Sequence, residues 1–236
     1  GTAALTTNQV SKGLTTDQVV ALRTDQVVAL KTNQVASLTT DQVAALETRD
    51  VAVLTSANIG ALTTDQISKG LTTSQVAALT TAGVTAVTTA GIAALTTDQV
   101  VAMRTDQVAA LKTGQVVALT TDGIAAMETR DVAALTTAGV GALSTNQISK
   151  GLTTDQVAAL TTGQTAAMTT AGVSSLTTDQ VVALRTDQVG ALKTDQVSAL
   201  TTDGIAAMET KDVAALTTAG TAALTTNQVS KGLTTD

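Results

Sequence analysis

The chain has 236 residues and a net charge of −6, and 44% of its residues are apolar, yet it contains no aromatic residue, Cys, His or Pro. A globular core of that size without aromatic side chains would be very unusual, whereas the apolar content is too high for a disordered chain. The negative charge disfavours binding to nucleic acid or to anionic membrane surfaces. Since no apolar run approaches the length of a membrane span, we expect no membrane insertion.

An eight-residue unit recurs along the whole sequence. We label its positions a to h, so that Leu95 stands at a and Val100 at f in the unit Leu-Thr-Thr-Asp-Gln-Val-Val-Ala. Position a is otherwise almost always Leu, with exceptions at Val87 and at the four methionines, and position f is Val or Ile except at two threonines. These two columns predict the buried core, which includes Leu95, Val100, Leu111, Val116 and Leu119.

The spacing of the two apolar columns indicates which backbone conformation the chain adopts. In one continuous helix, eight residues overshoot two turns by roughly 80°, so the apolar columns would spiral off any single face. In a strand, position f and the next position a are three apart and would point to opposite faces. The pattern instead predicts one short helix per octad. Thr at b or c can cap it, b to e reads as a capping box, and where b is Arg, Lys or Glu we expect Thr at c to cap alone.

Helices this short are unstable in isolation, so neighbouring units must stack. The predicted fold is therefore an all-α solenoid, or superhelix, of one-to-two-turn helices, in which three octads are a possible superhelical turn. We expect residues 1–236 to form one continuous repeat region that is part of a longer chain, because residues 1–17 recur letter for letter as residues 220–236.

In chain order, four units carry a ninth residue, a glycine after Ser-Lys, and they begin at Leu5, Leu62, Leu143 and Leu224. They divide the chain into superrepeats 5–61, 62–142 and 143–223, with the next beginning at 224. The first superrepeat equals the others with 24 residues, or three octads, removed. Gly at the end of a short helix predicts a left-handed C-terminal cap.

Charges at position b follow the superrepeats. Arg and Glu at this position are always three octads apart, as in Arg104 and Glu128, and again in Arg185 and Glu209. If three octads form one turn, each Arg lies beside the Glu of the next turn. The alternative is that the order of the charges only reflects duplication.

No residue pattern predicts catalysis, a metal site or a bound cofactor. Hydroxyl groups are plentiful, but without any His they lack a base to activate them. The Asp at position d offers one carboxylate per unit without a calcium-binding glycine-rich repeat, which favours helix capping and solvation. The Gly residues at position e allow tight packing. Regular Thr pairs leave an ice-binding or surface-adhesive module open as an alternative.

Two resemblances follow from these residues. The unit Leu14-Thr-Thr-Asp-Gln-Val-Val-Ala21 resembles the opening helix of the repeats in transcription-activator-like DNA-binding effectors, but the unit length and the acidic charge differ, so DNA binding is not carried over. The segment Ala36-Ser-Leu-Thr-Thr-Asp-Gln-Val-Ala-Ala45, like most of the chain, resembles octapeptide tandem-repeat tracts of very large secreted bacterial surface proteins, often labelled adhesins or haem-utilisation proteins. That resemblance implies an extracellular, adhesin-like or filamentous setting.

Together these observations predict a non-enzymatic structural protein, a stalk or filament on a bacterial surface. We expect it to self-associate or to continue covalently into a fibre. The alternatives are the ice-binding or adhesive module and a protein–protein scaffold.

Overall fold

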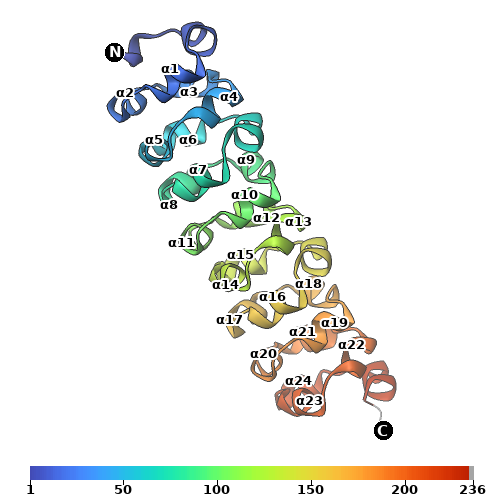
Figure 1. The fold of residues 1–236 in the computed structure, drawn as a ribbon. Coiled ribbons are helices and arrows are strands. Elements are labelled where there is room, and N and C mark those ends of the chain that lie inside the picture. Colours follow the sequence, from blue (N-terminus) through green and yellow to red (C-terminus); the bar gives the residue numbers. More distant parts are fainter. Residues whose placement is uncertain (234–236) are drawn as a thin grey trace. The chain divides into compact units, whose positions relative to one another are not determined.

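The computed structural model describes residues 1–233, and within them the chain is helical and has no strand. It divides into two compact units, Gly1–Leu119 and Thr120–Asp236, and each is described here by itself. In both units one short helix forms in each octad, so the predicted all-helical solenoid is confirmed (Figure 1). Within residues 1–233 none of the helices has the length and apolar character that crossing a bilayer requires.

Unit 1 contains twelve α-helices, one 3₁₀ helix (η1) and two π-helical turns (η2 and η3). Their bounds are η1 Thr2–Ala4, η2 Gln9–Gly13, α1 Thr16–Val20, α2 Thr24–Val28, α3 Thr32–Ser37, α4 Thr40–Ala45, α5 Thr48–Val53, α6 Ser56–Gly60, η3 Gln66–Gly70, α7 Thr73–Ala78, α8 Thr81–Ala86, α9 Thr89–Ala93, α10 Thr97–Val101, α11 Thr105–Ala109 and α12 Thr113–Ala118.

The described part of unit 2 repeats the arrangement with twelve α-helices and two π-helical turns (η4 and η5). Their bounds are α13 Thr121–Ala126, α14 Thr129–Ala134, α15 Thr137–Gly141, η4 Gln147–Gly151, α16 Thr154–Ala159, α17 Thr162–Ala167, α18 Thr170–Ser174, α19 Thr178–Val182, α20 Thr186–Gly190, α21 Thr194–Ala199, α22 Thr202–Ala207, α23 Thr210–Ala215, α24 Thr218–Ala222 and η5 Gln228–Gly232.

A capping box at position b starts a typical helix. The Thr96 hydroxyl accepts a hydrogen bond from the backbone N–H of Gln99 at 3.2 Å, and the Thr96 N–H donates to Gln99 Oε1 at 2.9 Å. The helix ends where the following Leu at position a turns extended, as at Leu119 with φ −60° and ψ 140°. Two extended residues, at a and b, therefore re-aim the chain before the next helix.

Thr at position c does not replace a missing Thr at b, contrary to the sequence expectation. Where Arg23 stands at b it remains the N-terminal cap without a side-chain cap bond, and Thr24 is already the first helical residue. The helix start is held instead by Gln26, whose Oε1 accepts from the Arg23 N–H at 3.0 Å. Where e is Gln, its side chain accepts from the backbone N–H at b, whether b is Thr, Arg or Lys.

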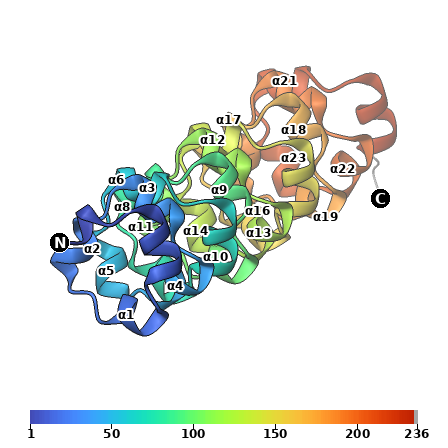
Figure 2. The same cartoon turned by 90° about the horizontal axis from the view of Figure 1, so that it is seen from above.

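Three octads make one turn of the solenoid, as the sequence suggested. In unit 1, α1 packs on α4, α2 on α5, and α3 on α6, which in turn packs on α8. Seen from above, these sets gather as three separate groups (Figure 2). In unit 2, α18 packs on α21, α19 on α22 and α20 on α23. Each unit is therefore a solenoid with three helical stacks.

The a and f columns form the core of both units. Leu111, Val116, Val100 and Leu119 are buried, and the four methionines at position a are buried as well. Leu95 differs, because it is only half-buried. Since isolated helices of five or six residues are unstable, burial of these side chains between turns is what stabilises them.

The ninth residue of the Ser-Lys-Gly units is absorbed by a π-helical turn. The N–H of Leu71 donates to the carbonyl of Gln66, five residues earlier, at 2.8 Å. No described residue has a positive φ, so the expected left-handed glycine cap is wrong. Glycine is needed at Gly70 for another reason. A Cβ there would lie 3.1 Å from Val43 Cβ and 3.2 Å from the Thr40 carbonyl oxygen of the turn beneath.

Replacement of Leu111 tests the core. Leu111→Asp loses an almost fully buried side chain and buries a charge, so we expect a loss of about 4 kcal/mol or more in unfolding free energy. Lys112→Asp, at the exposed neighbouring position, should change it by less than about 1 kcal/mol. Denaturant unfolding followed by circular dichroism measures both. Equal tolerance of the two changes would contradict the core assignment.

Replacement of Gly70 tests the close approach of the π turn. Gly70→Ala should lower the unfolding free energy by about 1–3 kcal/mol, because the added methyl meets backbone and a β-branched side chain. The matched control is Gly114→Ala, where the nearest atom would be Thr89 Cγ2 at an ordinary 3.7 Å. There the better helix propensity of Ala should stabilise by about 0.5–1 kcal/mol. Stabilisation by both changes would show that the π turn has room for a side chain.

Candidate functional site

The most elaborate polar arrangement lies at the corners of the solenoid, where one octad passes into the next. At a corner, the side chain at position e of one turn meets the backbone carbonyls at f and at the following a of the turn beneath. Gln107 is representative. Its Nε2 donates to the Val76 carbonyl at 2.9 Å and to the Leu79 carbonyl at 2.7 Å, while its Oε1 accepts from the Arg104 N–H at 2.7 Å.

The same bridge recurs throughout both units. In each case a buried glutamine amide donates to one f carbonyl and to one a carbonyl that lie 28 to 32 residues earlier, at Gln34, Gln42, Gln66, Gln75, Gln99, Gln107, Gln115, Gln156, Gln164, Gln180, Gln188, Gln196 and Gln228. One side chain thus caps its own helix and satisfies the last carbonyls of a helix one turn away.

The capping role of position e was predicted from the sequence, but its burial and its bond to the next turn were not. The signal was present, because position e carries only Gln, Asn, Asp or Gly along the chain. Where Gly stands at e, packing replaces the amide. At Gly91 a Cβ would lie 2.5 Å from Ile67 Cδ1, so this glycine is required by a neighbouring side chain. Tight packing at these glycines was the expected role.

Aspartate occupies three corners, and the one at Asp50 is fully buried. Its Oδ1 accepts a hydrogen bond from Thr24 Oγ1 of the turn beneath at 2.7 Å. Its Oδ2 is buried and has no hydrogen-bond partner. The corresponding residue of unit 2, Asp212, accepts from Thr186 Oγ1 at 2.6 Å. A carboxylate cannot donate, so here the turn beneath supplies the donor.

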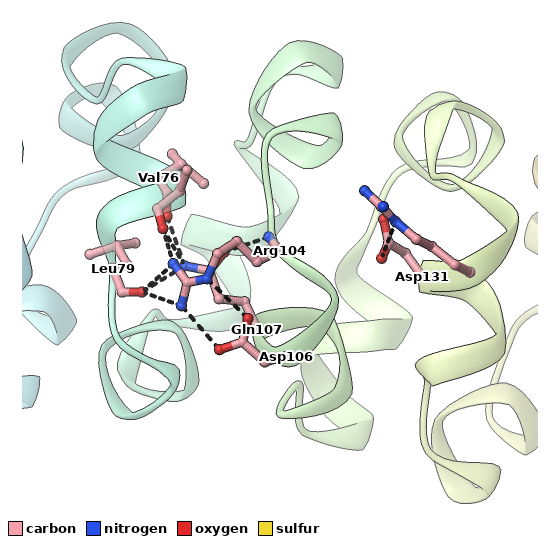
Figure 3. Close-up of polar contacts among 8 residues, drawn as sticks. Val76, Leu79, Arg104, Asp106, Gln107 and Asp131 are labelled. Carbon is pink, nitrogen blue, oxygen red and sulfur yellow. Dashed lines mark hydrogen bonds and ion pairs between the residues drawn. The ribbon is translucent and has the colours of Figure 1, made fainter.

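Arginine at position b adds a second contact to a corner. The Arg104 guanidinium pairs with Asp106 through two hydrogen bonds of 3.0 Å, and it also donates to the backbone carbonyls of Ala77 and Leu79 (Figure 3). Arg185 has the corresponding partners Asp187, Ala158 and Leu160. The positive charge therefore faces carbonyl oxygens of the preceding turn.

The hydrogen bonds from Arg104 lower the pKa of Asp106, and those from Arg185 lower the pKa of Asp187. A lowered folded-state pKa stabilises the fold fully above the unfolded value, which is about 4, and this contribution is lost as the pH falls through the lower folded-state pKa. Both carboxylates are exposed to solvent, so each pair is a surface interaction.

The ion pairs of the predicted Arg–Glu partners are local ones. Arg185 pairs with Asp187, and Glu209 pairs with Lys211 at 2.6 Å. Their helices α20 and α23 do lie on adjacent turns, and a hydrogen bond between these turns joins the next residue, Thr186, to Asp212. An approach of Arg185 to Glu209 stays a prediction.

Arg104 and Glu128 lie in different units, so each is placed only within its own. Both are exposed. Glu128 pairs with Arg130 at 2.8 Å, and the neighbouring Asp131 side chain is almost fully buried (Figure 3). Their predicted approach stays a prediction.

Among the described residues, no three side chains of the His, Cys, Asp and Glu types gather closely enough to hold a metal ion. Many Thr hydroxyls at position b are committed to capping, as at Thr72, Thr153 and Thr177. The arrangement joins turns to one another, and its residues define a repeat solenoid.

The comparisons identify the repeat. The family model for the ALTTAQ repeat matches residues 2–32, 14–48, 43–81, 69–105, 81–113, 89–121, 124–162, 162–194 and 205–236. The chain belongs to the ALTTAQ repeat family. A search of the curated proteins finds no match. Among solved structures, a crystal structure of the leucine-rich repeat-containing protein LegL7 from Legionella pneumophila is similar at 7% identity, over 81% of this chain and 69% of that chain. Its TM-score is 0.23, so this likeness carries no structural argument.

Substitution of Gln107 tests the corner bridge. Gln107→Glu keeps an acceptor for the Arg104 N–H but loses both donors to the carbonyls beneath. At pH 7 the charged side chain should lower the unfolding free energy by about 2–4 kcal/mol. Near pH 4 the loss should shrink, because a protonated carboxyl regains one donor.

The matched control for Gln107→Glu is Gln18→Glu. Gln18 forms the same capping box with Thr15 but is exposed. It should change stability by less than about 1 kcal/mol at either pH. If Gln107→Glu were as mild as Gln18→Glu, the amide would act as a cap alone and not as a bond between turns.

Proposed function

We propose that this chain is a segment of a structural stalk or filament on a bacterial surface, and that it extends a functional module away from the cell. The observation that carries the proposal is that, within each unit, successive helices pack against helices one turn away, as α1 does on α4 and α20 on α23. Such contacts are nearly all local and require no closing element, so the same arrangement supports any number of turns.

The side chains at the corners favour this function over that of an enzyme or a reader of nucleic acid. The buried Gln amides are used for bonds between turns, and the chain carries no His, Cys or Tyr that would serve acid–base or nucleophilic chemistry. The net charge of −6 opposes binding to a polyanion. We therefore propose a non-catalytic protein whose partners are further copies of the same repeat, either in the same chain or in another.

The extracellular, bacterial setting is supported by the resemblance of the octapeptide tracts to those of very large secreted surface proteins. A stalk outside the cell also suits a chain that has no Cys to form or rearrange disulfides. The membership of the ALTTAQ repeat family agrees with a tandem array.

The dependence of particle length on the number of tandem copies tests the proposed stalk. Proteins made of one, two and three tandem copies of residues 1–219 keep the natural register, because residue 220 repeats residue 1. Negative-stain electron microscopy should show rods of constant width whose length rises in equal steps with copy number. Immunogold labelling of intact source cells with antibody against the repeat should mark the outer surface.

Compact particles whose diameter grows with the cube root of mass would contradict the stalk. Labelling that appears only after the cells are broken would contradict the surface location and would leave the rod measurement unaffected. The two parts of the proposal are therefore tested separately.

A further inference from the structure

At each glutamine corner, two backbone carbonyl oxygens of the turn beneath converge on one point. We call this pair, the f carbonyl and the following a carbonyl, the carbonyl clamp. In the Gln99 corner the clamp oxygens of Ile67 and Leu71 lie 2.7 Å and 2.6 Å from the amide nitrogen. The corner at Gln107 repeats this with 2.9 Å and 2.7 Å. The clamp is therefore a preformed site for a hydrogen-bond donor or a small cation.

Cationic side chains already use the clamp. The Arg104 guanidinium donates to the a carbonyl of Leu79, which also accepts from Gln107. The Arg185 guanidinium donates in the same way to Leu160. Two carbonyl oxygens at the end of a short helix keep unused lone pairs, so they can bind a positive group in addition to their helical bonds.

The clamp beneath Asp50 has no amide to fill it. By the register of the glutamine corners, its carbonyls belong to Val19 and Leu22, which stand at f and a one turn below Asp50. Asp is shorter than Gln by one methylene, and its carboxylate has no N–H to donate, so these carbonyls receive no hydrogen bond from the side chain at position e. The Asp50 side chain is 1% exposed, and its Oδ2 has no partner.

The positive side chain nearest to this carboxylate does not reach the orphan oxygen. Arg49 Nε lies 4.0 Å from Asp50 Oδ1, at the limit of an ion pair, and the Arg49 guanidinium pairs with Glu47 at 2.5 Å. The local group of Glu47, Arg49 and Asp50 thus carries one net negative charge, and a buried, unpaired carboxylate oxygen is destabilising.

We propose that the aspartate corner binds a hard cation, sodium or calcium, between Asp50 Oδ2 and the carbonyl clamp of Val19 and Leu22. The donor set consists of oxygen atoms alone, which is the preference of these ions, and the hydroxyl oxygen of Thr24 completes it from the same turn. The ion neutralises the buried charge and ties two turns together, as the amide does elsewhere. In unit 2, Asp212 likewise accepts a hydrogen bond from Thr186 Oγ1 of the turn beneath, at 2.6 Å.

Thermal unfolding of the whole chain in different salts tests the site. The protein is first dialysed against a chelator in choline chloride and is then measured in choline chloride, sodium chloride and calcium chloride at equal ionic strength. We expect the midpoint to rise by about 5 °C in the salt of the bound ion, at concentrations well above its dissociation constant. A rise in sodium chloride identifies sodium, and a rise confined to calcium chloride identifies calcium.

Variants separate this site from general salt effects. The variant Asp50→Asn, Asp131→Asn, Asp212→Asn replaces all three aspartates at position e, and within their own units the new amides at 50 and 212 can donate to the clamp, as Asn58 Nδ2 already does to the Leu30 carbonyl at 3.1 Å. This protein should fold and should lose the dependence on the cation. The control Asp25→Asn, Asp106→Asn, Asp187→Asn removes three exposed carboxylates and should keep it.

Equal midpoints of the unaltered protein in all three salts would overturn the proposal and would leave a neutral guest such as water at this corner. A midpoint shift that survives in the variant without the corner aspartates would also overturn it. Neither result bears on the stalk, whose length depends on stacking and not on an ion.

Discussion

The fold depends on one shared hydrogen-bonding group, the side-chain amide at position e. A helix of five or six residues leaves most of its backbone donors and acceptors unpaired, and burying them without partners would cost more than the small Leu and Val core returns. The oxygen of Gln107 caps its own helix, and its nitrogen satisfies two carbonyls of the turn beneath. All the partners of this amide are backbone groups, so its hydrogen bonds do not depend on the neighbouring side chains. Positions b, d and g are therefore free to vary.

The corner also explains the few places where the repeat departs from its usual form. Gly91 stands where Ile67 fills the space of the amide, and Asp50 stands where Thr24 supplies a donor from below. At both sites the group that takes the place of the amide belongs to the unit three octads earlier in the sequence. The unit of design is therefore the pair of adjacent turns, and a single octad carries only half of each interaction.

Much of the architecture follows from the spacing of apolar residues. The three-residue step from f to the next a rules out one long helix and a strand, and the recurrence of charges every three octads indicates the turn length that the stacking of α20 on α23 confirms. The errors concern local geometry. Gly70 was expected to adopt a left-handed conformation, yet the constraint is a backbone one turn below, which no local pattern reveals. Thr24 was expected to cap because the capping box was assigned to units with Thr at b, whereas Gln26 also accepts from the backbone N–H of Arg23. The restricted composition of position e indicates that this column is buried. Its hydrogen-bond partners could not be predicted, because they lie about 30 residues away in the sequence.

The direction of the glutamine bonds has a mechanical consequence. Because each amide joins one turn to the next, these bonds and the apolar contacts around them lie in series along a stack of helices, so every layer carries the same pull and the weakest layer yields first. When a layer yields, it releases one turn of 24 or 25 residues, while the layers beyond keep their own bonds. Fully extended, such a length of chain spans about 80–90 Å. Within each unit, tension is thus relieved in small, equal and separately reversible steps, as in an extensible tether that absorbs a shock without breaking.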